Sequence, residues 1–285
     1  LSSSLGAQHT ISGPFSPSED FKWIMAYQLK PNSQEYVTAG PIKNGTLEMI
    51  MPKTAGAGLY RMVYAIPTDE FYFDVIYNGK EDIQLSFNTS NGVSFTSSEE
   101  NATYLAYLKE IIVAEKKLAD YYTLGGTEKT DFKTIIDNLK SIQHSFESKS
   151  IGMIAHNFIK ANKPYIPLKQ ETQGQFRQSK KDHIFDVLDF NNPVLQSLGF
   201  LMDKAVAFVF MPVSAKTTNT VGTQEVQNNL EVLNGKMTDV DAIFKARLLE
   251  KIWTETNKRK MGASSDLIYN NYLLPLSKPV GKKKY

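Results

Sequence analysis

The feature that most constrains the fold of this chain is a change in hydrophobic period near Ser98. Through residues 9–97, β-branched and aromatic residues alternate with polar ones, and turn-forming residues recur between the runs. This period of two is typical of half-buried strands. From residue 99 onward, apolar residues recur three and four positions apart, which is the spacing of one helix face. We therefore predict an α+β, multidomain protein in which a sheet comes first and helices follow.

Two Asn-Gly pairs stand between apolar runs in the first region, at Asn44-Gly45 and Asn78-Gly79. Both are predicted to form two-residue hairpin turns, because type I′ geometry requires a positive φ at both central residues. Short strands joined by such turns favour an antiparallel β-sandwich or a small barrel. We place this domain at residues 8–98.

The second region, residues 99–272, is predicted to be an α-helical domain. Amphipathic patterns alternate there with short polar stretches, and the segment 165–178 has the composition of a loop. The expected helices cover residues 99–122, 130–149, 151–162, 180–190, 192–210, 223–235, 238–260 and 264–273.

The two ends of the sequence suggest further elements. Residues 1–7 resemble the last part of a secretory signal peptide with cleavage after Ala7, although an ordinary chain terminus would also account for them. Residues 273–285, "LLPLSKPVGKKKY", place a Pro-Val-Gly turn between two short runs, which is typical of a β-hairpin. An isolated hairpin is marginal in water. We therefore expect it either to open a further domain or to pair with an edge of the N-terminal sheet.

The composition excludes several classes of function. The 285 residues contain no cysteine, so they offer no thiol nucleophile, no disulfide and no cysteine-bound zinc. No apolar run has the length of a membrane helix, so we expect no membrane span. Positive charge is concentrated in residues 258–285, with 7 Lys/Arg against 1 Asp/Glu. Because the rest of the chain has no basic face, we interpret this end as a solubilising surface and expect no nucleic-acid partner.

The densest group of titratable residues is Asp182, His183 and Asp186. On a helix, Asp186 would share a face with both of the others, so that these side chains could bind one metal ion. No second metal motif accompanies it, and we expect these acids to be solvated while the apolar residues of the segment pack inward: Phe185, Leu188 and Phe190. The sequence thus predicts no catalytic, cofactor-binding or metal-binding residue and no cofactor.

Two other signals have structural interpretations. His156 lies beside the apolar stripe of an expected helix, where a partly buried structural histidine is the simpler interpretation. The Gly-Gly pair in "LGGTEKTD" lacks the spacing of a phosphate-binding loop. Neither is predicted to carry chemistry.

Three stretches together resemble a known family. They are "TISGPF" with "VTAGPIKNGTLEMIMPKTAGAGLYRMVY", then "HIFDVLDFNNPVLQSLGFLMDKAVAFV", and finally "LLPLSKPVGKKKY". They are similar to the N-terminal part of exported thiol–disulfide oxidoreductases of Bacteroidetes. Proteins of that family carry a signal peptide, a β-rich domain of unknown function, a helical middle region and a C-terminal thioredoxin-like domain of the alkyl hydroperoxide reductase and thiol-specific antioxidant superfamily. The resemblance covers nearly the whole chain through structural motifs, and no catalytic position of the family falls within it.

The resemblance implies that this chain is the non-catalytic accessory or binding region of an exported thiol–disulfide oxidoreductase. Its redox domain would lie beyond residue 285, and 273–285 would be the hairpin that opens it. The implied location is periplasmic or otherwise extracytoplasmic, and the implied partners are the thioredoxin-like domain in cis and an exported protein substrate. Two alternatives stay open: a free-standing extracytoplasmic binding module without a redox role, and a metal-dependent hydrolase that uses Asp182, His183 and Asp186.

Overall fold

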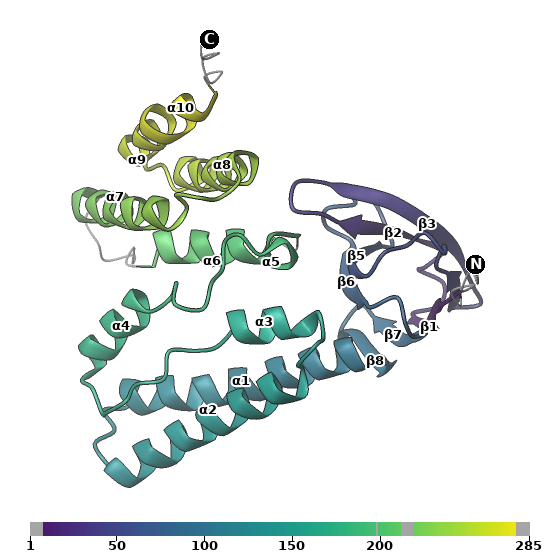
Figure 1. Ribbon diagram of the computed structural model, residues 1–285, viewed down its shortest axis with the longest axis horizontal. Helices are drawn as coiled ribbons and strands as arrows, with labels where there is room; N and C mark the ends of the chain where they lie inside the picture. Colours follow the sequence, from purple (N-terminus) through teal and green to yellow (C-terminus); the bar gives the residue numbers. More distant parts are fainter. Residues whose placement is uncertain (1–7, 198, 212–218, 278–285) are drawn as a thin grey trace, which may run out of the picture. The chain divides into compact units, whose positions relative to one another are not determined.

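The computed structural model describes residues 8–197, 199–211 and 219–277, and it divides into two compact units. The first unit ends at His183 and contains a β-barrel-like domain and four helices (Figure 1). The second unit begins at Ile184 and is helical. None of the helices in the described part of the chain combines the length and the apolar character that crossing a bilayer requires.

Eight strands form one nearly closed, barrel-like sheet, in the order β6-β5-β2-β3-β4-β1-β7-β8. This confirms the predicted α+β class and the small-barrel form of the first domain. One detail of the prediction is wrong: β1 runs parallel to β7, so the sheet is mixed and not purely antiparallel. The strands are β1 (Thr10–Ser16), β2 (Trp23–Leu29), β3 (Gln34–Lys43), β4 (Thr46–Ile50), β5 (Gly58–Val63), β6 (Tyr72–Tyr77), β7 (Ile83–Asn88) and β8 (Gly92–Ser97).

The two predicted hairpin turns have different outcomes. Asn44 and Gly45 have φ of 51° and 71° and join the antiparallel strands β3 and β4, so that prediction is confirmed. The prediction at Asn78-Gly79 is wrong, because β6 pairs with β5 whereas β7 pairs with β1 and β8. The Asn78 side chain instead accepts a hydrogen bond from the Lys80 amide at 2.9 Å. This local turn leads the chain from one edge of the sheet to a different strand.

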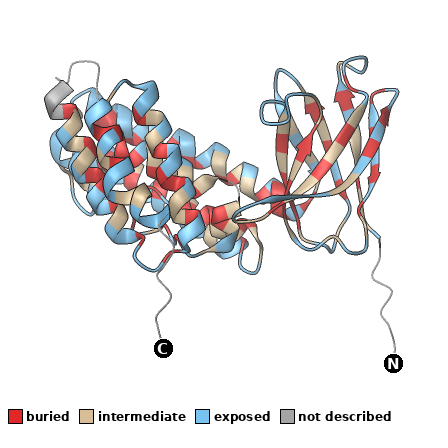
Figure 2. Cartoon of the chain, turned by 90° about the horizontal axis from the view of Figure 1, so that it is seen from above, coloured by how far each residue is buried: buried red, intermediate tan, exposed pale blue. Residues whose placement is uncertain are grey.

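The barrel interior is a packed aromatic core. Along β4 and β7, buried residues alternate with more exposed ones, and Figure 2 shows buried positions on the strands in red. The rings of Phe15, Phe21, Phe73 and Phe87 lie in contact, with Phe87 centred 5.0 Å from Phe73 and 5.4 Å from Phe15. Such stacked and tilted pairs add to the free energy of burial. The barrel is therefore filled by its own side chains.

Helix α1 (Glu99–Thr123) contacts both terminal strands of the sheet order, β6 and β8, and so covers part of the seam between them. Its buried Asn101 pairs with the backbone of β6: Oδ1 accepts from the Ile76 amide at 2.9 Å, and Nδ2 donates to the Ile76 carbonyl at 2.7 Å. Nδ2 also donates to Ser98 Oγ, which caps the helix. The Asn101 side chain thus makes the two backbone hydrogen bonds with Ile76 that a neighbouring strand would otherwise make.

The remaining helices of the first unit are α2 (Lys129–Lys149), α3 (Ala155–Ala161) and α4 (Gln173–Asp182). The predictions for 99–122 and 130–149 are confirmed, whereas the third helix begins only at Ala155. A buried carboxylate from α1 explains that start: Glu100 accepts from the Ile154 and Ala155 amides at 3.0 and 2.8 Å. The predicted loop at 165–178 is wrong in its second half, because Thr172 begins α4 with a capping box.

The second unit contains α5 (Pro193–Ser197), α6 (Phe200–Val209), α7 (Asn219–Lys236), α8 (Ala242–Lys258), α9 (Gly262–Ile268), the π-helix η1 (Tyr269–Leu273) and α10 (Leu274–Ser277). The helix predicted for 180–190 is wrong beyond Asp182, where turns replace it. The one predicted for 192–210 is broken at Gly199, which has a φ of 67°. The expected inward packing of the segment after α4 is confirmed for Phe185, Leu188 and Phe190.

The predictions for the two chain ends fall mostly outside the described residues. The signal-peptide segment 1–7 and residues 278–285 of the expected hairpin lie there. The described part of that hairpin, residues 273–277, is helical and forms no strand. Leu274 and Leu276 follow directly on α9 and η1, so the helix continues through them.

Candidate functional site

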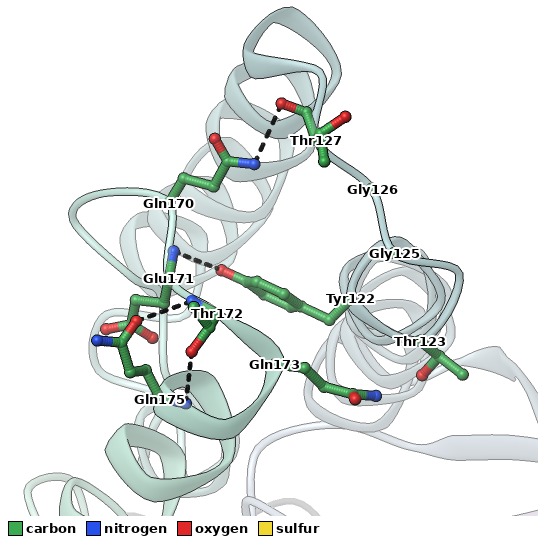
Figure 3. Close-up of a pocket in the computed structure, with 10 residues that line it drawn as sticks. All are labelled: Tyr122, Thr123, Gly125, Gly126, Thr127, Gln170, Glu171, Thr172, Gln173 and Gln175. Atoms are coloured by element: carbon green, nitrogen blue, oxygen red, sulfur yellow. Dashed lines mark hydrogen bonds between the residues drawn. The ribbon is translucent and has the colours of Figure 1, made fainter.

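A pocket of about 560 Å³ lies in the first unit, where α1 ends and α4 begins (Figure 3). Its volume falls within the range of about 300–1,000 Å³ that is usual for small-molecule sites. Three segments line it: the end of α1 with the loop that follows, the connector before α4, and the first turn of α4. The lining residues are Tyr122, Thr123, Gly125, Gly126, Thr127, Gln170, Glu171, Thr172, Gln173 and Gln175.

The first wall is a tight turn made possible by two glycines. Gly125 has a φ of 71°, a left-handed backbone conformation that favours glycine. A glycine in this conformation is a common way for a helix such as α1 to end. The Gly126 amide donates to the Tyr121 carbonyl at 2.8 Å, and a Cβ at Gly126 would lie 2.5 Å from the Tyr121 ring. The chain therefore folds directly onto that ring, which places Thr123 and Thr127 on either side of the turn.

The second wall is the connector before α4, and two adjacent tyrosines of α1 hold it in place. Gln170 Nε2 donates to the Tyr121 hydroxyl at 2.7 Å and to the Thr127 carbonyl at 3.3 Å. The Glu171 amide donates to the Tyr122 hydroxyl at 3.4 Å (Figure 3). These bonds join residues that lie 43 to 49 positions apart in the chain. The pocket is thus fixed by side-chain hydrogen bonds at both walls.

A row of neighbouring aromatic rings begins at Tyr122 in the pocket lining. Tyr122 stacks on Phe176 of α4 at 4.3 Å, Phe176 lies 6.0 Å from Tyr165, and Tyr165 stacks on His183 at 5.2 Å. Burial, as the largest cause, raises the pKa of both Tyr122 and Tyr165. Both phenols therefore stay protonated and neutral at physiological pH.

Among the described lining residues, Glu171 alone is acidic, and its carboxylate is turned inward. Oε1 accepts hydrogen bonds from the Tyr165 hydroxyl at 2.8 Å and from the Ser179 hydroxyl at 3.1 Å. Oε2 is buried and has no hydrogen-bond partner among the described residues. The charge of Glu171 is therefore directed at its own scaffold and away from the pocket opening.

The pocket lining retains unused hydrogen-bonding groups, all of them uncharged. Among the described residues, the side chains of Thr123, Thr127 and Gln173 form no hydrogen bond. The amide nitrogen of Gln175 is also unused, since only its Oε1 accepts, from the Thr172 amide at 2.9 Å. Each hydroxyl or amide can both donate and accept. The site can therefore bind a polar ligand, and its described lining residues include no nucleophile paired with a base.

The structure does not bring the sequence-predicted metal candidates together. Asp182 accepts from Gln178 at the end of α4, His183 stacks on Tyr165, and Asp186 is an exposed residue of the second unit. Within the described ranges, no three His, Asp or Glu side chains are grouped as a metal ion would require. The expected shared helix face does not exist, because α4 ends at Asp182.

The other histidines lie in separate places. His156 Nδ1 is 2.8 Å from the buried Ser150 Oγ, which agrees with its structural interpretation. His9 lies 3.6 Å from Asp82 in the barrel, and His144 is exposed on α2. None of them borders the pocket.

Sequence reasoning missed the pocket residues. The Gly125-Gly126 pair was informative as the end of a helix, and the run "QETQGQ" at 170–175 is unusually rich in amides. The signal that was missing is the contact between them, which depends on the positions of Tyr121 and Tyr122 in three dimensions.

Comparisons with models of known protein families, with curated proteins and with solved structures find no match for this chain. The fold and the pocket geometry therefore carry the functional argument.

Proposed function

We propose that this chain is a non-catalytic binding region and that the pocket between α1 and α4 is its ligand site. The observation that carries the proposal is the set of unused neutral side chains around a preformed space of about 560 Å³. Pockets that are largely preformed and contain a few convergent polar groups are the usual form of ligand sites. With no cysteine and no nucleophile–base pair in the lining, binding is the activity that these residues support.

The resemblance in the sequence adds a context to this proposal. In that context, the chain is the accessory region of an exported thiol–disulfide oxidoreductase, and it holds a ligand or substrate near a thioredoxin-like domain. The redox chemistry would belong to that domain, because the 285 residues here contain no thiol.

A free-standing extracytoplasmic binding module is the second candidate. One observation favours it: every lining residue of the pocket comes from the first unit of this chain. Binding at such a pocket would need no residue from a redox domain. The two candidate functions share the binding site. They differ only in whether a thioredoxin-like domain works together with it.

The binding proposal is tested by a thermal-shift screen of small molecules on the 285-residue chain and on the variant Thr123→Val/Gln173→Ala. A ligand that binds only the folded protein increases its free energy of unfolding, by about 2.7 kcal/mol when the ligand is present at about 100 times its Kd. The Tm rises as a result. The variant should lose this stabilisation by the ligand. Without ligand, its Tm should equal that of the unmodified protein, because neither replaced side chain forms a hydrogen bond among the described residues.

Gln178→Ala is the matched control, since this exposed amide lies on α4 but does not line the pocket. Its response to each compound should equal that of the unmodified protein. If every stabilising compound shifts the pocket variant and the unmodified protein alike, the pocket is not the binding site and the proposal is wrong.

A further inference from the structure

The chemistry of the pocket lining identifies a class of ligand. We propose that the pocket binds a neutral, polyhydroxylated molecule such as an uncharged sugar. This inference rests on the proposed binding function and goes beyond it by naming the ligand class. Four properties of the described lining residues lead to it.

Charge is the first property. No Lys, Arg or His is among the described lining residues, so a phosphate, sulfate or carboxylate would find no cationic partner. The single acid, Glu171, gives one oxygen to Tyr165 and Ser179 and keeps the other buried. A cationic ligand would therefore find no accessible carboxylate oxygen. The lining favours a ligand without charge.

Polarity is the second property. The described lining contains no Leu, Ile, Val, Met or Phe side chain, so a large apolar ligand group would find only the Tyr122 ring as a large apolar surface there. Binding an apolar group there would instead desolvate amides and hydroxyls without pairing them, which costs free energy. This argues against a peptide that is anchored by a large hydrophobic side chain.

The geometry of the walls is the third property. They are helix ends and loops, formed by the end of α1, the connector and the first turn of α4 (Figure 3). A peptide bound by strand addition requires an exposed sheet edge. None of the lining residues belongs to a strand.

The fourth property is the kind of hydrogen-bonding group that remains unused. Thr123, Thr127 and Gln173 each offer a donor and an acceptor, and the Gln175 amide nitrogen adds a donor. A sugar hydroxyl also donates and accepts, so each such group can be paired by one ligand hydroxyl. The protonated phenol of Tyr122 adds a further donor, since its hydroxyl oxygen accepts from the Glu171 amide and leaves the O–H free to donate. A ligand with several adjacent hydroxyls complements this set.

Titration calorimetry of the 285-residue chain tests the inference with three probe sets. The first is neutral disaccharides (maltose, cellobiose, lactose and N,N′-diacetylchitobiose), the second is a sulfated disaccharide, and the third is a mixture of unstructured decapeptides. We expect at least one neutral disaccharide to bind with a Kd of about 1 mM or lower. Its Kd should change less than about twofold between about 0.05 and 0.5 M NaCl, because no charge pair forms.

The pocket variant Thr123→Val/Gln173→Ala should weaken disaccharide binding by about tenfold or more, because two hydrogen bonds are lost. Gln178→Ala should leave it unchanged. If only the sulfated sugar or the peptides bind, and the pocket variant abolishes that binding, the ligand class is wrong while the proposed binding site stands. If no probe and no screened compound depends on the pocket, both the ligand class and the proposed site are wrong.

Discussion

Asn101→Ala is expected to destabilise the first unit by about 2–6 kcal/mol, because the substitution leaves a buried donor and a buried acceptor without partners at about 1–3 kcal/mol each. Those two groups are the amide and the carbonyl of Ile76 in β6, and Asn101 is 4% exposed. Urea unfolding monitored by Trp23 fluorescence in a Trp253→Phe background measures this loss, because Trp23 lies in the first unit and Trp253 in the second.

The matched control is Asn138→Ala, which replaces an exposed asparagine within α2 of the same unit. Surface substitutions of this kind change stability by about 0.5 kcal/mol or less. A loss for Asn101→Ala as small as the loss for Asn138→Ala would mean that water or another residue pairs with Ile76. The account of the barrel seam would then be wrong.

Phe185→Ala is expected to destabilise the second unit by about 3–5 kcal/mol, the usual cost of deleting a buried aromatic ring. Phe185 is 8% exposed, and its ring lies 4.5 Å from Phe208 and 5.8 Å from Phe190. Urea unfolding monitored by Trp253 in a Trp23→Phe background reports on this unit.

The neighbouring substitution Asp186→Ala tests the alternative role of the same segment. Asp186 is exposed, so its loss should cost about 1 kcal/mol or less. A loss at Asp186 that equals the loss at Phe185, or a stability that rises on addition of Zn²⁺ and falls again in Asp186→Ala, would restore the metal-site hypothesis.

The local parts of the fold could be predicted from the sequence, and the non-local parts could not. The Asn44-Gly45 turn depends on backbone preferences of two residues, and the switch near Ser98 depends on a local period. The parallel pairing of β1 with β7 joins residues such as Ile11 and Ile83, and no local preference specifies it. Asn78-Gly79 shows the same limit, because the strands on its two sides pair with other strands and not with each other.

Helix ends that depend on tertiary contacts could not be predicted from the sequence either. The apolar residues Phe185 and Leu188 have helical spacing, but they reach the core of the second unit from turns. The start of α3 depends on Glu100, which lies more than fifty positions earlier in the chain. The pocket could not be predicted from the sequence for the same reason, because the hydrogen bond between Gln170 and Tyr121 forms only in the folded state.

Amide hydrogen exchange on the 285-residue chain, with and without the compound that stabilises it most in the thermal-shift screen, tests the central claim most directly. The binding account predicts slower exchange at residues 122–127 and 170–175, where the pocket walls lie, with little change in the barrel strands β1–β8. Slower exchange confined to the barrel or to the second unit, with the two pocket segments unchanged, would contradict it.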